Sequence, residues 1–212
     1  MAVKAVVFDV GRVLYEWDRR YLFEKLIEGR EELDRFLDIV VPLQWHEQHD
    51  AGRPINGMIA ERIAEFPAHE DLLCAYRDRW LETIPGPVPG VHALVESLAM
   101  RNVPLFAITN FGADFWEMFR PTAPIFDRFE DIVVSGFEKL MKPDPAIYAL
   151  ALRRFGLAPG EGLFIDDSLP NVESARANGF VAHHFNDAKT LRAELTALEL
   201  LPGQPDDVQH VG

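Results

Sequence analysis

Short apolar runs alternate with stretches of helical period along most of the chain, and this alternation constrains the fold more than any other feature. Five runs have the length and composition of buried strands: 4–8, 103–108, 132–134, 163–165 and 180–183. Segments 91–101, 145–155 and 169–178 carry apolar residues three and four positions apart, and each lies beside one of these runs. The alternation predicts an α/β fold, a Rossmann-like open parallel sheet with helices on both faces.

One interval breaks the alternation. Between about residues 18 and 83 no strand pattern appears, but amphipathic segments do, at 21–27, 32–40, 55–66 and 71–84. We therefore expect an all-helical insertion after the first strand, with the proline-rich segment 84–90 as a stiff return to the sheet. The resulting division is a Rossmann-like core in 1–16 and 86–201, a helical cap in 17–85 and a C-terminal coil tail in 202–212.

Composition argues against several classes of function. The 212 residues carry a formal net charge of −13 at pH 7 and no basic stripe, which argues against nucleic-acid binding. No run approaches the roughly 18 apolar residues of a membrane-spanning helix, and the first apolar run is too short for a signal peptide. We expect a globular, cytoplasmic protein with no membrane partner. The negative charge would also repel a phosphorylated substrate unless cations reverse it locally.

Polar side chains follow the apolar runs at or just beyond the points where the predicted strands end. They are Asp9, Thr109, Asn110, Lys142, Asp166 and Asp167. In an open parallel sheet, ligands bind outside the carboxyl ends of the strands, where the strand order reverses. The three aspartates offer the hard oxygen ligands that Mg²⁺ prefers, and a lysine among acids stays charged and can hold an anion. The set predicts a site for a phosphate group and a divalent cation.

Each of these residues also has a purely structural explanation. An aspartate that closes a strand, such as Asp9, is often a turn former, and Lys142 taken alone could be a surface charge. Thr109, Asn110 and the acidic pair 166–167 could cap the helices that follow them. Their joint occurrence, in this order and at matching strand ends, favours the functional interpretation.

Four segments in order, FDVGRVL, FAITN, KPDP and FIDD, resemble the four motifs of the haloacid dehalogenase-like hydrolase superfamily. The helical insertion resembles the C1-type cap of that superfamily, so the similarity spans almost the whole chain. It implies that Asp9 is the nucleophile that takes up a phosphoryl group. It further implies that Thr109 and Lys142 hold the transferring oxygens, with Asn110 on the substrate side.

The resemblance also implies a Mg²⁺ site, formed by the carboxylates of Asp9, Asp166 and Asp167 and the backbone carbonyl of Gly11. The chain departs from the family pattern at Gly11, where the phosphatases usually carry a second aspartate. That residue protonates the leaving oxygen and later activates water. A subgroup with FDxG in the first motif resembles this chain in its cap and includes sugar-phosphate phosphatases, so the glycine does not exclude turnover.

Three functions remain open. The favoured one is a Mg²⁺-dependent phosphatase of a small phosphorylated metabolite. A 2-haloacid dehalogenase needs no acid at position 11, but the acids of FIDD would repel its carboxylate substrate. The third is a degenerate core that binds a phosphorylated ligand or a protein without turnover.

The missing acid has a kinetic consequence for a phosphatase. A positioned general acid typically contributes about 10²- to 10⁴-fold, so hydrolysis without one should depend steeply on the leaving group. Glu16 and Asp18 are the nearest acids in sequence that could replace it. Asp18, however, directly precedes a cap helix and is more simply its N-cap.

Several residues near the motifs are weaker candidates. Arg12 could offset the acidic field for an anionic substrate or point to solvent, and Trp17 and Trp45 could line the pocket entrance or pack between cap and hinge. His46 and His49 lie three positions apart in WHEQHD, and with Asp50 they could imitate a metal site. Their spacing differs from the zincin pattern, so a polar face of the cap is the simpler explanation.

Overall fold

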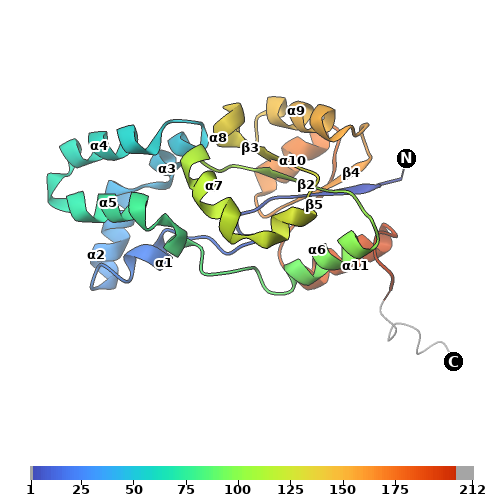
Figure 1. The fold of residues 1–212 in the computed structure, drawn as a ribbon, viewed down its shortest axis with the longest axis horizontal. Helices are drawn as coiled ribbons and strands as arrows, with labels where there is room; N and C mark the ends of the chain where they lie inside the picture. The colour runs from blue at the N-terminus through green and yellow to red at the C-terminus, as the bar shows by residue number, and fades with distance from the viewer. Residues whose placement is uncertain (1, 204–212) are drawn as a thin grey trace.

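A computed structural model describes residues 2–203, and its centre is a five-stranded parallel sheet (Figure 1). The strands are β1 (Ala5–Phe8), β2 (Leu105–Thr109), β3 (Asp131–Val134), β4 (Gly162–Asp166) and β5 (Val181–His184). Their order in the sheet is β3-β2-β1-β4-β5. β1 is central, with Val6 opposite Leu105 of β2 on one side and Leu163 of β4 on the other. The strand order therefore reverses at β1, which is where ligands bind in sheets of this kind.

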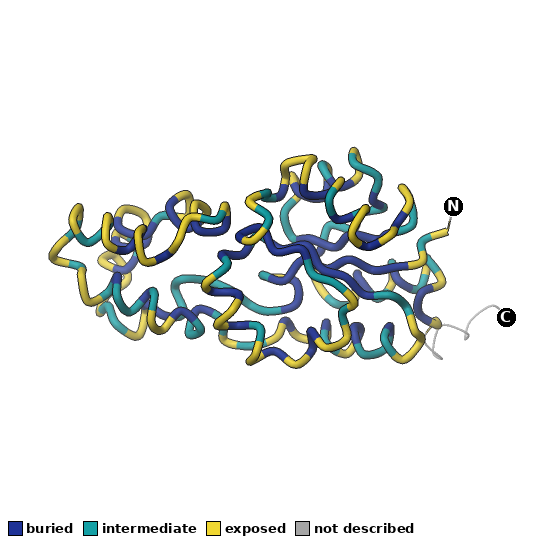
Figure 2. The backbone as a smooth tube through the Cα atoms, turned by 45° about the horizontal axis from the view of Figure 1, so that its top comes forward, coloured by how far each residue is buried: buried dark blue, intermediate teal, exposed yellow. Residues whose placement is uncertain are grey.

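Two helices cover each face of the sheet, as Figure 1 shows: α9 (Pro145–Phe155) and α10 (Leu169–Ala177) on one face, α6 (Val91–Met100) and α11 (Ala188–Ala197) on the other. Successive side chains of a strand point to opposite faces, and β1 follows this rule. Val7 packs in the apolar cluster that contains α9 and α10, and Val6 packs in the cluster that contains α6 and α11. The strands are the buried middle layer of the molecule (Figure 2). The predicted Rossmann-like class is confirmed.

The insertion between β1 and α6 has helices as its regular elements, and these lie at the end of the molecule opposite the N-terminus (Figure 1). Its helices are α1 (Arg20–Phe23), α2 (Arg30–Arg35), α3 (Leu43–Asp50), α4 (Ile55–Glu65) and α5 (Glu70–Asp78). A π-helical turn, Phe36–Val40, and two 3₁₀ turns, Pro67–His69 and Trp80–Thr83, complete it. Trp80 stacks on Phe115 of α7 (Ala113–Phe119), with ring centroids 4.4 Å apart, and this aromatic contact joins the insertion to the sheet domain.

All five predicted strands are present, with ends within two residues of the expected ones. The expected helix at 145–155 is found with the same bounds, because its ends are encoded locally. The Asp144 carboxylate accepts the backbone N–H of Ala146 at 2.8 Å, Pro145 occupies the first turn, and Gly156 takes φ 64° at the end.

Other elements depart from the sequence expectation. Segment 21–27 is α-helical only through Phe23, and α11 was not predicted. α11 shows only two buried apolar residues, Leu191 and Leu195, which is too weak a period to detect. No helix within residues 2–203 has the length and apolarity needed to cross a membrane. The tail predicted for 202–212 lies, beyond Gly203, outside the described residues, and the core–cap boundaries stay predictions.

Candidate active site

Asp9 is the first residue beyond β1 and lies where the strand order reverses. Its backbone N–H donates to the carbonyl of Ile165 at 2.8 Å, which continues the ladder to β4. Its Oδ1 accepts the backbone N–H of Val10 at 2.7 Å. The chain then turns back through Arg12, whose φ is 59°, so that Gly11 and Arg12 line the same cavity as Asp9. The carboxylate is therefore held by backbone bonds at the edge of a cavity.

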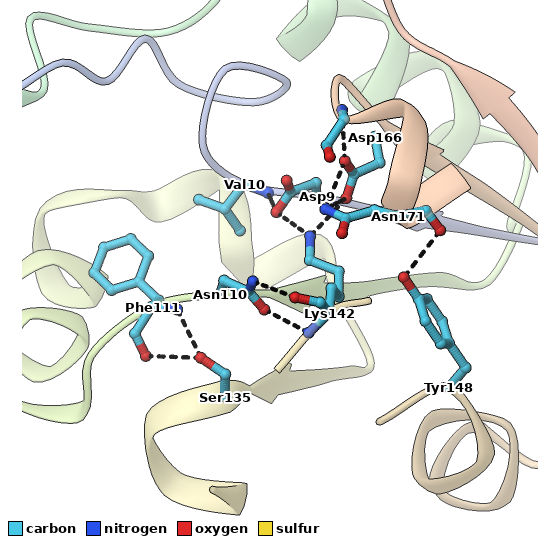
Figure 3. Close-up of polar contacts among 10 residues, drawn as sticks. Asp9, Val10, Asn110, Phe111, Ser135, Lys142, Tyr148, Asp166 and Asn171 are labelled. Atoms are coloured by element: carbon cyan, nitrogen blue, oxygen red, sulfur yellow. Dashed lines mark hydrogen bonds and ion pairs between the residues drawn. The ribbon is translucent and has the colours of Figure 1, made fainter. Parts of the chain in front are cut away.

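Lys142 lies between two of the aspartates (Figure 3). Its Nζ is 2.8 Å from Oδ1 of Asp9 and 2.7 Å from Oδ2 of Asp166, and the side chain is buried. Burial by itself would lower the pKa of Lys142, but the two carboxylates reverse this and hold its pKa above the ordinary value. Asn110 positions the lysine by two reciprocal bonds, accepting the Lys142 backbone N–H at 2.8 Å and donating to its carbonyl at 2.9 Å. The site thus holds a permanent buried cation.

Asp9, Asp166 and Asp167 form the one grouping of three or more acidic, histidine or cysteine side chains within residues 2–203 that could hold a metal ion. One oxygen from each lies within 4.8 Å of the others. Asp166 is oriented by the side-chain amide of Asn171 at 3.0 Å and by the backbone N–H of Ser168 at 2.8 Å. Three hard oxygen donors on one edge fit a magnesium ion.

Burial and the neighbouring charges strongly shift the pKa of Asp9, the candidate nucleophile. Burial raises the pKa of Asp9 to about 8, with Lys142 acting in the opposite direction and the carboxylates of Asp166 and Asp167 adding to the rise. Burial, followed by the neighbouring Asp166, also raises the pKa of Asp167. The uncompensated negative charge at this edge of the sheet is what a divalent cation would neutralise.

Thr109 ends β2 and is buried, and its hydroxyl has no hydrogen-bond partner among the described residues. A buried hydroxyl without a partner is costly, which suits a group that bonds a ligand oxygen. Asn171, by contrast, was not singled out from the sequence. The sequence did indicate this residue, because it lies in the first turn of the helix that follows FIDD. The Tyr148 hydroxyl donates to the Asn171 backbone carbonyl at 2.9 Å, a bond drawn in Figure 3.

The cavity beside Asp9 has a volume of about 190 Å³. Its lining residues come from the first motif, α3 and the loops after β2 and β4: Asp9, Val10, Gly11, Arg12, Tyr15, Trp17, Leu43, His46, Glu47, Asp50, Ile84, Asn110, Phe111, Asp167 and Ser168. Arg12 lies over the Trp17 ring, 5.6 Å from its centroid. The cavity therefore combines a charged end with several aromatic and aliphatic side chains.

Two cap residues lie elsewhere than the sequence suggested. Trp45 is buried and packs against Tyr76, with ring centroids 5.7 Å apart, and it is not among the cavity-lining residues. His46, for which the sequence suggested a polar face of the cap or an imitation of a metal site, lines the cavity and stacks on Trp17. Burial lowers the pKa of His46 to about 3, so the ring is neutral.

A close contact between α3 and the loop after β2 leads to a stability prediction. A Cβ on Gly112 would lie 1.9 Å from Cδ2 of His49, a buried ring whose Nδ1 is bonded to the Arg53 carbonyl at 2.7 Å. We expect Gly112→Ala to lower the free energy of unfolding by about 1–3 kcal/mol through overpacking. Gly57→Ala, on an exposed helical position with open space, should instead raise it by about 0.5–1 kcal/mol. Urea unfolding of both variants measures this, and an unchanged midpoint for Gly112→Ala would contradict it.

Comparisons with known proteins agree with this geometry. The profile of the haloacid dehalogenase-like hydrolases matches residues 3–179. A sesquiterpene phosphatase from Aspergillus oryzae is 26% identical over 195 residues, covering 92% of this chain and 96% of the relative. A phosphorylated carbohydrates phosphatase from Thermotoga maritima is 30% identical over 129 residues, and the match covers 58% of this chain and 58% of that relative.

A solved structure shares the fold. The HAD family enzyme BT-2542 from Bacteroides thetaiotaomicron, in complex with magnesium and inorganic phosphate, superposes with a TM-score of 0.67 at 21% identity, covering 88% of this chain and 96% of that one. The fold and the matched profile define a hydrolase. The chain belongs to the haloacid dehalogenase-like hydrolase family.

Proposed function

We propose that the protein is a Mg²⁺-dependent phosphatase that hydrolyses a small phosphorylated metabolite through an aspartyl-phosphate on Asp9. The observation that carries this proposal is the position of Lys142, whose Nζ contacts both Asp9 and Asp166 at the edge of a cavity. In this arrangement a phosphate that enters the cavity meets a nucleophilic carboxylate, a fixed positive charge and the oxygen donors of a cation site. Relatives named as phosphatases support the same assignment.

Each residue then has a defined part. The Asp9 carboxylate attacks the phosphorus, while Lys142 and the free hydroxyl of Thr109 hold oxygens of the transferring group. Asp9, Asp166, Asp167 and the Gly11 carbonyl would hold Mg²⁺, which when bound supplies positive charge to the phosphoryl oxygens. Asn110 keeps Lys142 in place through its two backbone bonds.

The cavity wall supports a substrate whose body is at least partly apolar. Tyr15, Trp17, Leu43, Ile84 and Phe111 share the cavity with Asp9. Such side chains favour apolar or ring-shaped groups of a substrate, and Arg12 adds a positive charge that can bind an anionic group. The Aspergillus relative, by its name a phosphatase of sesquiterpenes, is consistent with this class. Of the sequence candidates, Trp17 and Arg12 therefore remain proposed substrate contacts, and Trp45 does not. A cytoplasmic location is part of the same proposal.

The dehalogenase alternative is less well supported. Its substrate is a carboxylate, which Asp166 and Asp167 would repel, and its chemistry needs no metal ligands. A degenerate core is also less well supported, since nucleophile, cation and oxygen donors lie together.

Trapping of the covalent intermediate tests the proposal against a binding-only core. Incubation with 4-nitrophenyl phosphate and Mg²⁺, an acid quench and proteolysis should yield a phosphorylated peptide that contains Asp9. Hydroxylamine should remove the phosphoryl group from this peptide, as it does from acyl phosphates. Asp18→Asn should be phosphorylated to the same extent as the wild type, because Asp18 is not a cavity residue and its carboxylate accepts the Arg20 backbone N–H at 2.8 Å. Binding of the ester without a phosphorylated peptide and without release of phosphate would show a degenerate site.

A further inference from the structure

The first motif carries a glycine where an acid would protonate the leaving group, but the cavity holds other acids. Four acidic side chains line it: Asp9, Glu47, Asp50 and Asp167. Asp9 and Asp167 belong to the nucleophile and cation group, which leaves two residues of α3. Glu16 and Asp18, the nearest acids in sequence, are not among the lining residues. Any acid that replaces the missing one from inside the cavity therefore comes from the cap helix α3.

The two α3 acids differ in environment. Glu47 is exposed, whereas Asp50 is only 6% exposed, and one of its carboxylate oxygens has no hydrogen-bond partner among residues 2–203. Its other oxygen lies 3.5 Å from Nε2 of His46, whose Nδ1 is 2.8 Å from the Tyr76 hydroxyl. A buried carboxyl group with one unpartnered oxygen can keep a proton and present it to a ligand.

Asp50 is also tied firmly to the sheet domain. The Ser135 hydroxyl donates to the Asp50 backbone carbonyl at 2.6 Å and accepts the Phe111 backbone N–H at 2.9 Å. Ser135 directly follows β3, and Phe111 is the neighbour of Asn110, whose side chain bonds the backbone of Lys142 (Figure 3). The cap residue is therefore positioned by the same loops that build the phosphate site.

The surroundings of Asp50 favour its neutral form well above the pH at which an exposed aspartate ionises. Burial raises the pKa of Asp50 to about 7, opposed by the Gly112 backbone N–H and Lys142, with Glu47 adding to the rise. Asp50 is also the last residue of α3, where the helix dipole disfavours a negative charge. The neighbouring His46 is neutral, so it contributes no compensating positive charge.

We propose that Asp50 is the general acid and base of the reaction, supplied by the cap in place of the acid missing at Gly11. The inference rests on the proposed phosphatase function. In the first step an Asp9 oxygen bonds to phosphorus, the bond from phosphorus to the leaving oxygen breaks, and the Asp50 proton moves to that oxygen to give the free alcohol. In the second step a water oxygen bonds to phosphorus and gives a proton to the Asp50 carboxylate, while the bond between phosphorus and the Asp9 oxygen breaks. This releases inorganic phosphate and restores both side chains.

Two phosphate esters with different leaving groups test this. Single-turnover rates of alcohol release, which report the first step alone, are measured with Mg²⁺ for wild type, Asp50→Asn and Glu47→Gln, using butyl phosphate and 4-nitrophenyl phosphate. Asp50→Asn should lose about 10²- to 10⁴-fold on butyl phosphate, whose alkoxide needs the proton, and under tenfold on the nitrophenyl ester. Glu47→Gln, the same acid-to-amide substitution one turn earlier on the same helix and cavity, should not show this selective loss.

Several outcomes would overturn the assignment. Equal losses on both esters in Asp50→Asn, a selective loss in Glu47→Gln instead, or wild-type turnover of the aryl ester alone would each show that Asp50 is not the acid. These results leave the phosphatase proposal standing. Hydrolysis of neither ester by wild type would reject the phosphatase itself, and with it this role of Asp50.

A second measurement needs no turnover. Because the pKa of folded Asp50 lies above its unfolded value of 3.8, its stability contribution is complete below about pH 4 and is lost as pH rises to about 7. The free energy of unfolding of wild type, relative to Asp50→Asn, should therefore fall across this range and then level off. A pH-independent difference would show Asp50 ionised at neutral pH and would exclude it as the acid.

Discussion

Replacing Asp9 with asparagine is expected to reduce hydrolysis by on the order of 10⁴- to 10⁶-fold while leaving the protein folded. The amide is nearly isosteric with the carboxylate but is a poor nucleophile, so the aspartyl-phosphate cannot form. Rates of phosphate release under saturating Mg²⁺, with circular dichroism and urea unfolding as checks of the fold, measure the effect.

A matched control is the same chemical change away from the site. Asp71→Asn alters an exposed residue in the first turn of α5, which is not among the cavity-lining residues, and should retain the wild-type rate. Appreciable turnover by Asp9→Asn, with contaminating phosphatases excluded by parallel purification, would show that another group attacks. Asp50, Glu47 and Asp167 are the remaining carboxylates in the cavity and would then be tested in turn.

Removal of divalent cations is expected to reduce hydrolysis to background, and added Mg²⁺ should restore it. Three carboxylates lie together at this edge of the sheet, and Lys142 is the cation that contacts two of them. A phosphate dianion entering this group without a further cation would be repelled, since close charges interact strongly where water is excluded. Rates before and after chelation, followed by titration with Mg²⁺, measure the dependence.

Asp167→Asn provides an intermediate case, because it replaces one charged carboxylate donor with a neutral amide oxygen and leaves the nucleophile and the lysine contacts in place. It should raise the Mg²⁺ concentration needed for half-maximal rate and weaken the rise in melting temperature that Mg²⁺ produces by binding the folded state. Full activity of the wild type in excess chelator would reject the phosphatase assignment and favour the dehalogenase alternative.

The sheet and the meeting of Asp9, Lys142 and Asp166 at one edge of it could be predicted from sequence, because both depend on local patterns. Strand length, apolar content and punctuation by glycine and proline located the five strands, and a parallel sheet brings their carboxyl ends to one edge. Asp9 and Asp166 lie at that edge through backbone geometry alone. The sequence predicted that Lys142 would lie beside them, and in the structure its Nζ contacts both carboxylates.

Only the tertiary structure decided which cap residues face the cavity. In α3 the side chains of Trp45 and His49 form one buried stripe and those of His46 and Asp50 form the next. Both stripes are buried, so helical period cannot tell which of them faces the cavity. Packing of the helix against Tyr76 and Phe115 places Trp45 in the interior, and the Ser135 bond holds Asp50 at the cavity. These contacts join residues distant in the chain, and for that reason neither the exclusion of Trp45 nor the recruitment of Asp50 could be derived from the sequence.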